Sequence, residues 1–449
     1  MADTSLLFLV LILLPPLALL LTLTILVRPR PVKIPIKGRH VFITGGSSGI
    51  GLALAHQAAS EGARVSILAR KADKLEEARN SIRLSTGIDV AVFSVDVRDS
   101  DAVQRAIDEA DPIDILICNQ GVFIPQELEL QSLETVKFMI DVNLMGTFHL
   151  IKSALPNMKN RGDRRPASIA IMSSQAGQVG IYGYTAYSAS KFGLRGLGEA
   201  LQQEVIADNI HVSLIFPPDT ETPGFLEETK TRPLLTSIIA ASSGAMKADE
   251  VAKKALDGIK SGRFIVPCNL DGFLLSIATA GLSPQRSPLM AFIEVVSAGA
   301  LRIGALFFQW NWYGSIARWH AQKTSAAGIG GIFRRRDGTI NWSFSGLIGI
   351  ASSTKAEIMS ALTGIRIARD LSYQNIIIKR DSANTIKWLA DPGSGPWALA
   401  HFLAEARDIL SNLNAQLGWI PRELNSDADG LAKAGAHRDF LFSDSFLPT

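Results

Sequence analysis

The stretch HVFITGGSSGIGLALAHQAASEGA, residues 40–63, decides how the middle of the chain folds. An apolar, β-branched run leads into glycines and then into a segment with helical periodicity, which predicts a strand, a glycine turn and a helix. Gly45, Gly49 and Gly51 keep the TGxxxGxG spacing, in which missing side chains let backbone amides approach a pyrophosphate at a helix N-terminus. The sequence therefore predicts a dinucleotide site at this turn.

The next strand, RVSILAR, ends at Arg70. A dehydrogenase that selects NAD is expected to carry an acidic residue there for the ribose hydroxyls. Arg70, helped by Lys71 or Lys74, instead suits the 2′-phosphate of NADP; the alternative is that these are solvated charges at a helix start. We favour NADP.

Two further strands end in polar residues. AVFSVDV places Asp96 where it suits an adenine amino group, and ILICNQG places Asn119 and Gly121 beside the expected cofactor cleft. Because doubly wound folds bind ligands at the carboxyl ends of parallel strands, these residues are expected at one edge of an α/β sheet.

Tyr187 and Lys191 lie one helical turn apart in IAIMSSQAGQVGIYGYTAYSASKFGL, after the strand-end pair Ser173 and Ser174. A free tyrosine has a pKa of about 10, and a nearby cation such as Lys191 would favour its phenolate. A serine hydroxyl would stabilise the substrate oxygen as charge develops there. The sequence does not decide which serine does so.

In a reduction, Tyr187 would protonate the substrate oxygen while Lys191 also holds the nicotinamide ribose. Asn143, in DVNLMGT, would help to hold a water that connects Lys191 to solvent. We therefore predict a carbonyl or alcohol oxidoreductase.

The motifs TGGSSGIG, NQG, SSQAG and YSASK, in this order, resemble the short-chain dehydrogenase/reductase family over residues 38–265. Closer strings, such as VRPRPVKIPIKGRH and LIFPPDTETPGF, resemble the plant 3-ketodihydrosphingosine reductases within it, to about Lys323. The likeness implies a Rossmann-type fold that reduces the 3-keto group of a long-chain sphingoid base to dihydrosphingosine. A membrane-bound steroid or retinoid dehydrogenase is the alternative.

The same resemblance implies roles for individual residues. It implies NADPH binding by Gly45, Ser47, Ser48, Gly49, Arg70, Lys74 and Asp96, and catalysis by Ser173 or Ser174, Tyr187 and Lys191. It also implies residence in the endoplasmic reticulum membrane, with the catalytic domain at the cytosolic face.

The uncharged run from Leu6 to Val27 predicts a transmembrane helix, in an anchor of residues 1–30. A cleaved signal peptide is the alternative, but Asp3 is the only charge ahead of the run and no small-x-small pattern closes it. By the positive-inside rule, the basic residues that follow predict a cytosolic domain. They are Arg28, Arg30, Lys33, Lys37 and Arg39.

Residues 266–323 are predicted to form membrane-associated hydrophobic helices that contact lipid. Two apolar stretches end in the Trp/Tyr-rich FFQWNWY, as expected at headgroups. Glu294 and Arg302 interrupt the second, so the sequence does not decide between a second span, a re-entrant hairpin and an amphipathic helix on the membrane. Ordinary buried core is the remaining alternative.

Residues 325–440 resemble the ribonuclease H-like domain of plant retroelement-derived proteins, in AGIGGIFRRRDG, KAE, KRDS and WIPRELNSDADGLAK. The resemblance implies a second α/β domain with Mg²⁺ between carboxylates. Glu357, Asp381 and Asp429 stand at three of the four expected positions, but WHAQKTSAAGIGG has no aspartate at the first. We expect an incomplete domain with little or no nuclease activity; nucleic-acid binding or cleavage of RNA/DNA hybrids is the alternative.

Composition further narrows the kinds of partner and binding site that we expect for the chain. The net charge of +3, from 45 basic and 42 acidic residues, gives no global electrostatic case for nucleic acid. Cys118 and Cys268 are far apart, which argues against a disulfide framework or zinc site. The sequence leaves open whether the chain forms a homo-oligomer.

Overall fold

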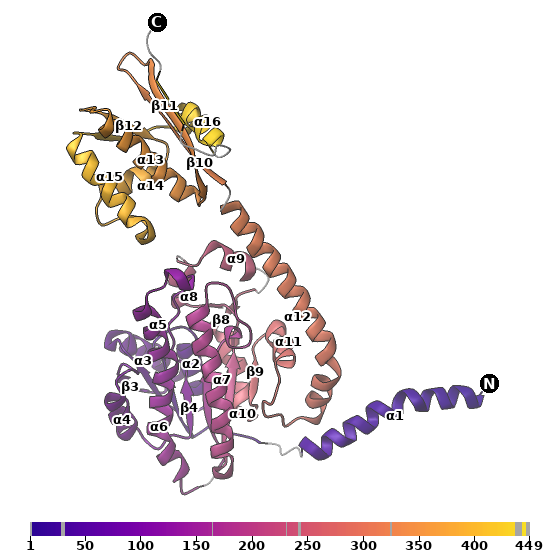
Figure 1. Cartoon of the computed structure of the whole chain (residues 1–449). Coiled ribbons are helices and arrows are strands. Elements are labelled where there is room, and N and C mark those ends of the chain that lie inside the picture. Colours follow the sequence, from indigo (N-terminus) through magenta and orange to yellow (C-terminus); the bar gives the residue numbers. More distant parts are fainter. Residues whose placement is uncertain are drawn as a thin grey trace. The chain divides into compact units, whose positions relative to one another are not determined.

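The computed structural model describes residues 2–27, 32–163, 165–229, 231–240, 244–323, 326–435 and 442–445. The chain divides into two compact units, Met1–Trp310 and Asn311–Thr449 (Figure 1). Arg28 and Arg30 of the predicted basic flank, and both ends of the predicted 325–440 domain, lie outside the described residues.

The first unit is built on a seven-stranded parallel sheet in the order β3-β2-β1-β4-β5-β6-β9. The reversal of strand order beside β1 is that of the predicted doubly wound α/β fold, which is confirmed. The strands are β1 His40–Thr44, β2 Arg64–Ala69, β3 Ala91–Ser94, β4 Ile115–Cys118, β5 Ala167–Met172, β6 Ile210–Phe216 and β9 Ile265–Pro267.

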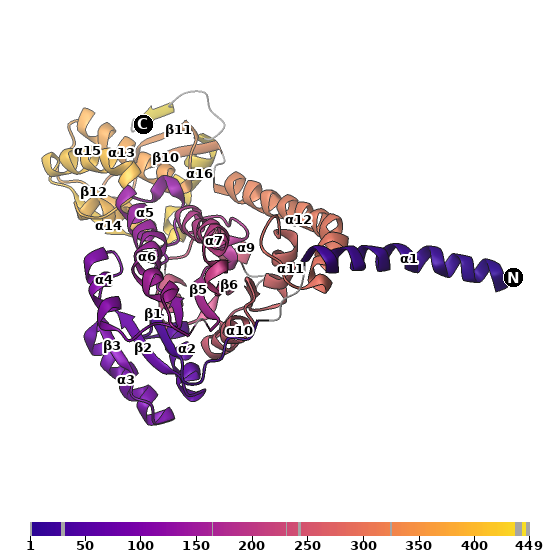
Figure 2. The same cartoon turned by 90° about the horizontal axis from the view of Figure 1, so that it is seen from below.

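Helices cover both faces of this sheet (Figure 2). Leu54, Leu75 and Leu256 pack helices α2, α3 and α10 on one face, and Ile107 and Leu150 pack α4 and α6 on the other with α7. The sheet is apolar on both sides, as a parallel sheet between helices requires. The helices are α2 Gly49–Ser60, α3 Ala72–Thr86, α4 Ser100–Glu109, α5 Leu133–Ile140, α6 Gly146–Lys159, α7 Thr185–Val205 and α10 Ala248–Lys260.

Smaller elements complete the unit. They are the π-helix η2 Asp141–Met145, the 3-10 helices η1 Leu128–Leu130, η3 Gln175–Gly177 and η4 Ile206–Asp208, the short parallel pair β7 Thr220–Glu221 and β8 Met246–Lys247, and the helices α8 Pro223–Thr229, α9 Leu234–Ala240 and α11 Leu270–Ala278.

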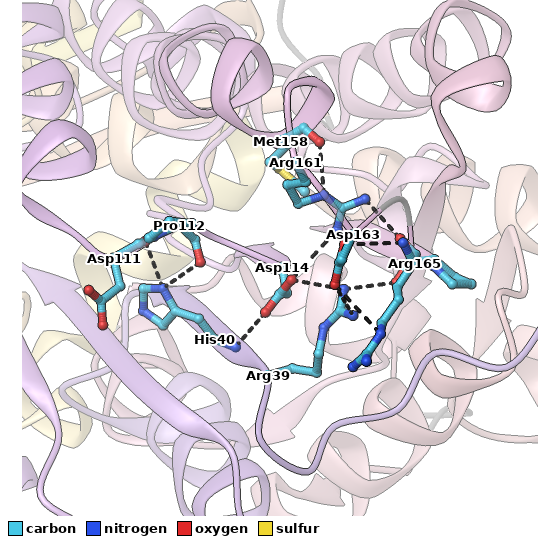
Figure 3. A network of polar contacts seen from close by, with 10 residues as sticks. Arg39, His40, Asp111, Pro112, Asp114, Met158, Arg161, Asp163 and Arg165 are labelled. Carbon is cyan, nitrogen blue, oxygen red and sulfur yellow. Dashed lines mark hydrogen bonds and ion pairs between the residues drawn. The ribbon is translucent and has the colours of Figure 1, made fainter.

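A buried ion pair ties the amino ends of β1 and β4 together (Figure 3). Arg39 is 4% exposed and lies 2.8 Å from Asp114, whose other oxygen accepts the backbone N–H of His40 at 2.9 Å. Arg161 lies 3.7 Å from the same carboxylate. Arg39 is therefore a structural cation of the fold, and only Lys33 and Lys37 of the described basic flank are exposed.

The predicted N-terminal helix forms as α1, Ala2–Val27, and its described side chains from Leu13 to Val27 are largely exposed and apolar. Residues 288–323 form one unbroken helix, α12 Pro288–Lys323. A re-entrant hairpin would need a turn, but this helix runs past Glu294 and Arg302 without a break. The re-entrant hairpin is therefore wrong. Only 6% of its most apolar window is buried, so the alternative of ordinary core is wrong for this second stretch.

Among the described residues, Pro288–His320 is the one helix long and apolar enough to cross a membrane. Its window has a mean hydropathy of 1.7. The apolar part of α1 whose side chains are described, Leu13–Val27, is shorter than a span.

The second unit begins within α12 and continues with the predicted hairpin, in which Ile332 pairs Ser343 and Gly338 turns the chain at φ +89°. Its described strands form two sheets, the antiparallel β10-β11-β14 and the parallel β12-β13, and Leu362, Ile365 and Leu403 form its core. The elements are β10 Ala326–Arg334, β11 Ile340–Ile350, α13 Ser353–Asp370, β12 Ile377–Arg380, α14 Ala383–Ala390, η5 Trp397–Leu399, α15 Ala400–Asn412, β13 Gln416–Trp419, η6 Arg422–Asn425, α16 Ser426–Gly435 and β14 Phe442–Ser445.

Candidate active site

The glycine turn after β1 is closed against its own backbone. Gly45 has a φ of +64°, in the left-handed region, and a Cβ on Gly51 would lie 2.2 Å from the Gly45 carbonyl oxygen. Neither position accepts a larger residue without moving the turn. The turn thereby brings the amino end of α2 to the carboxyl edge of the sheet, where a helix dipole favours a phosphate.

Two serines and an asparagine border this turn. Ser48 is the N-cap residue of α2 and is exposed, and its side chain makes no capping hydrogen bond, while Ser47 is half-buried. Asn119, at the end of β4, donates its side-chain amide to the carbonyl of Thr44 at 3.1 Å. The uncapped helix end and free Ser48 side chain fit a diphosphate.

Arg70 and Asp96 follow the neighbouring strands β2 and β3. Arg70 is exposed and forms no ion pair among the described residues. Lys74 differs, since its ammonium lies 2.7 Å from Glu77 one turn along α3. Asp96 also has a partner: hydrogen bonds from Arg98, at 2.7 Å for the shortest, lower the pKa of its carboxyl group.

Tyr187 lies near the start of α7, opposite the end of β5. Burial raises the pKa of its phenol, and a hydrogen bond with Ser174 acts in the opposite direction. Ser173, which is 2% exposed, instead donates to the backbone carbonyl of Lys191 at 3.0 Å. The structure thus brings Ser174, and not Ser173, to the tyrosine.

Lys191 lies one turn along α7, with its ammonium 5.6 Å from the centroid of the Tyr187 ring. It donates to the carbonyl of Met172 at 2.9 Å and is 4% exposed. Burial lowers its pKa to about 8. The Lys191 ammonium is close to the Tyr187 ring but forms no ion pair with it among the described residues. The ammonium can therefore also bind a ligand.

Asn143 lies fully buried within the π-helix η2, a kind of bulge that often marks functional sites. Its side-chain oxygen accepts from the backbone N–H of Val122 at 2.8 Å, and its amide donates to Ser190 at 3.0 Å. A Cβ atom on Gly121 would lie 3.6 Å from both the side-chain oxygen of Asn143 and the ammonium of Lys191. The missing side chain leaves room for a small polar molecule between them.

A second group of side chains around the tyrosine was not predicted from the sequence. Phe123 packs against Tyr184 and Tyr187, with ring centroids 4.5 and 4.2 Å away. The guanidinium of Arg232 lies 5.7 Å from the centroid of Tyr184. Tyr184 is recognisable from its place in the motif segment, but no local pattern marks Arg232, which follows α8.

The three candidate metal ligands of the second unit lie near one buried cation. Glu357, Asp381 and Asp429 all act through charge on Arg380, whose pKa burial lowers. Asn425 donates to Asp381 at 3.0 Å and Asp429 at 3.5 Å. Within the part of the chain that is described, no three acidic, histidine or cysteine side chains form a group that could hold a metal ion.

Comparison with known families gives two matches along the chain. A short chain dehydrogenase model matches residues 39–233, and a reverse transcriptase-like model matches residues 315–435. The first match contains the glycine turn, Asn143 and the Tyr187–Lys191 pair.

Curated relatives match the first part of the chain at high identity. The 3-dehydrosphinganine reductase TSC10A of Arabidopsis thaliana is 68% identical over 297 residues, which cover 66% of this chain and 91% of the relative. The 3-dehydrosphinganine reductase of Danio rerio is 39% identical over 288 residues, covering 62% and 85%. The 3-ketodihydrosphingosine reductase of Bos taurus is 37% identical over 303 residues, covering 66% and 90%.

Solved structures resemble the same part at lower identity. A short chain dehydrogenase/reductase from Burkholderia phymatum in complex with NAD is 24% identical, covers 57% of this chain and 98% of its own, and has a TM-score of 0.49. A short-chain dehydrogenase from Sphingobium yanoikuyae in complex with NADPH is also 24% identical, covers 52% and 88%, and has a TM-score of 0.47.

Proposed function

Since the chain belongs to the short-chain dehydrogenase/reductase family, we propose that it reduces the 3-keto group of 3-ketodihydrosphingosine to give dihydrosphingosine, with NADPH as reductant. The observation that carries the proposal is the 68% identity to a 3-dehydrosphinganine reductase, over nine tenths of that relative. Tyr187, Ser174 and Lys191 lie within residues 39–233, which the short chain dehydrogenase model matches.

The residues around the glycine turn fit a phosphorylated dinucleotide. Ser48 and the amino end of α2 would bind the diphosphate, and the unpaired guanidinium of Arg70 would bind the 2′-phosphate. Lys74 is less suited to bind the 2′-phosphate because its ammonium already forms an ion pair with Glu77. The preference for NADPH over NADH therefore depends mainly on Arg70.

When bound beside Tyr187, NADPH would supply the hydride that reduces the carbonyl carbon. Tyr187 donates its phenolic proton to the carbonyl oxygen, so that the C=O bond becomes CH–OH. Ser174 hydrogen-bonds the same oxygen and stabilises the developing negative charge. Lys191 provides the positive charge that stabilises the phenolate left on Tyr187, and Asn143 holds the water that returns the proton.

We place the protein in a membrane, with α12 as the segment that inserts. Its exposed side chains are apolar on several sides, and the aromatic residues Trp310 and Tyr313, 72% and 66% exposed, gather towards one end. α1, the amino-terminal helix of the first unit, would serve as a further anchor. Residence in the endoplasmic reticulum with the active site facing the cytosol would give the enzyme both its lipid substrate and NADPH.

The test is NADPH oxidation by the full chain reconstituted in lipid vesicles, with 3-ketodihydrosphingosine as substrate. We expect turnover by the wild type and a loss of about 10²–10⁴-fold in Tyr187→Phe. Tyr182→Phe, in the same segment, serves as the control and is expected to keep activity. No turnover of the sphingoid ketone beside turnover of a steroid ketone would overturn the proposal.

A further inference from the structure

A buried group of three charges lies beside the aromatic cluster at Tyr187. Arg232 lies between two carboxylates, 2.8 Å from Asp219 and 2.5 Å from Glu228. The Arg232 and Glu228 side chains are only 6% and 10% exposed, and that of Asp219 is 29% exposed. We call these three residues the acidic triad.

The acidic triad reaches the catalytic tyrosine through Tyr184. The guanidinium of Arg232 lies over the Tyr184 ring, and the ring centroids of Tyr184 and Tyr187 are 6.0 Å apart. After burial and the Ser174 hydrogen bond, the charges of Glu228 and Asp219 further raise the pKa of Tyr187. Both carboxylates are therefore close enough to act on whatever binds at the tyrosine.

The triad carries an unbalanced charge. One guanidinium faces two carboxylates, which leaves one negative charge when all three are ionised. No other cation among the described residues acts on Glu228, and burial raises the pKa of that carboxyl group. A buried carboxylate with no full counter-charge is stabilised by any cation that binds next to it.

Two polar atoms, one next to the triad and one within it, also lack partners. The Tyr184 hydroxyl and the Nε of Arg232 are buried without a hydrogen-bond partner among the described residues. A buried polar group without a partner is unfavourable, so such atoms are expected to pair with a ligand. Two unpartnered polar atoms therefore lie in the same group of side chains as the two carboxylates.

We propose that the acidic triad recognises a protonated amine next to the ketone that is reduced, with Glu228 and Asp219 facing the ammonium and Arg232 holding both carboxylates in place. This rests on the proposed function, because 3-ketodihydrosphingosine carries an amine on the carbon beside its keto group and a hydroxyl one carbon further. The triad would thus distinguish amino ketones from neutral long-chain ketones. Tyr184 offers its hydroxyl to the substrate hydroxyl.

The test compares two substrates of equal chain length in the full, vesicle-reconstituted protein: 3-ketodihydrosphingosine and its desamino analogue, 1-hydroxyoctadecan-3-one. In Glu228→Gln, the ratio of kcat/KM for the amino ketone over the desamino ketone is expected to fall about tenfold or more, mainly through KM, which corresponds to about 1.4 kcal/mol. Glu227→Gln, which removes an exposed carboxylate from the same helix, is the matched control and should keep the wild-type ratio.

Each other outcome has a defined meaning. Equal losses on both substrates would show that the triad only holds α8 in place, and an unchanged ratio would show that the amine is recognised elsewhere; either result overturns the inference. If the wild type reduces the desamino ketone but not the amino ketone, the proposed function itself fails. Should Glu228→Gln not fold, the wild type decides: an N-acetylated ketone, which is neutral, must show a KM about tenfold or more higher, and an equal KM overturns the inference.

Discussion

Ser174 shares a side-chain hydrogen bond with Tyr187, whereas its neighbour Ser173 donates to the backbone carbonyl of Lys191. We therefore expect Ser174→Ala to lower kcat by about 10²–10³-fold, because it removes a donor to the developing oxyanion. Ser173→Ala should instead lower stability by about 1 kcal/mol, the worth of one buried hydrogen bond. Steady-state kinetics and thermal unfolding of both variants separate the roles, and the reverse pattern would contradict the assignment.

The lowered pKa of Lys191 predicts a basic limb in the pH profile. The pH dependence of kcat/KM reports groups of the free enzyme, in which burial lowers the pKa of Lys191 to about 8. Above this pH the ammonium loses its proton, and kcat/KM for reduction should fall by about tenfold per pH unit. A flat profile up to pH 10 would contradict a charged Lys191 in the mechanism.

The same shift links Lys191 to stability. Its folded pKa of about 8 lies below the ordinary value of 10.5. Between these pH values the unfolded chain holds a proton that the folded chain has lost, so the unfolding free energy rises with pH across this window. Unfolding curves of the wild type and Lys191→Met, compared at pH 7.5 and pH 10, should show this rise in the wild type alone.

Arg70 is expected to set the cofactor preference. Arg70→Ala removes a charge-assisted hydrogen bond to the 2′-phosphate, worth about 1.5–3 kcal/mol, and should raise the KM for NADPH about 10–100-fold while the KM for NADH stays near its wild-type value. Lys74→Ala is the comparison, with a smaller effect because Glu77 already holds that ammonium. Equal losses with both cofactors would place the role of Arg70 in folding instead.

The Arg39–Asp114 pair is expected to hold the sheet together. Arg39→Met removes the nearer of the two cations beside the Asp114 carboxylate and leaves only Arg161, 3.7 Å away, so it should cost up to about 3–5 kcal/mol of unfolding free energy. Arg64→Met breaks an ion pair of similar length, 2.6 Å, between exposed residues, and should cost less than about 1 kcal/mol. Denaturant unfolding in detergent measures both, and equal costs would show that burial of the Arg39 pair does not matter.

The second unit is expected to be dispensable for reduction. Its core is built from its own residues, Leu362 and Leu403 among them, and a unit with its own core can fold and be removed separately. A chain that ends at Lys323 should keep kcat within about twofold of the full protein. A loss of NADPH binding in this shortened chain would show that the first unit needs the second.

The sequence by itself determined the parts of the protein whose residues act within a short stretch. The turn at Gly45 and Gly51, the strands that end at Arg70 and Asn119, and the single helical turn between Tyr187 and Lys191 follow from local periodicity and spacing. Such patterns are readable because side-chain direction repeats regularly along strands and helices. The parallel α/β sheet followed from strands that alternate with helices along the sequence.

The tertiary structure alone decided what depends on distant partners. Ser173 and Ser174 are adjacent and chemically identical, and only the packing of α7 against the end of β5 shows which one meets Tyr187. In the sequence, Arg39 is one of the basic residues that follow the predicted transmembrane helix. In the structure it pairs with Asp114 and is buried. Arg232 and Glu228 join the site because the chain after β6 folds back to Tyr184. Burial and pairing of charges depend on contacts between remote segments, and no local pattern encodes them.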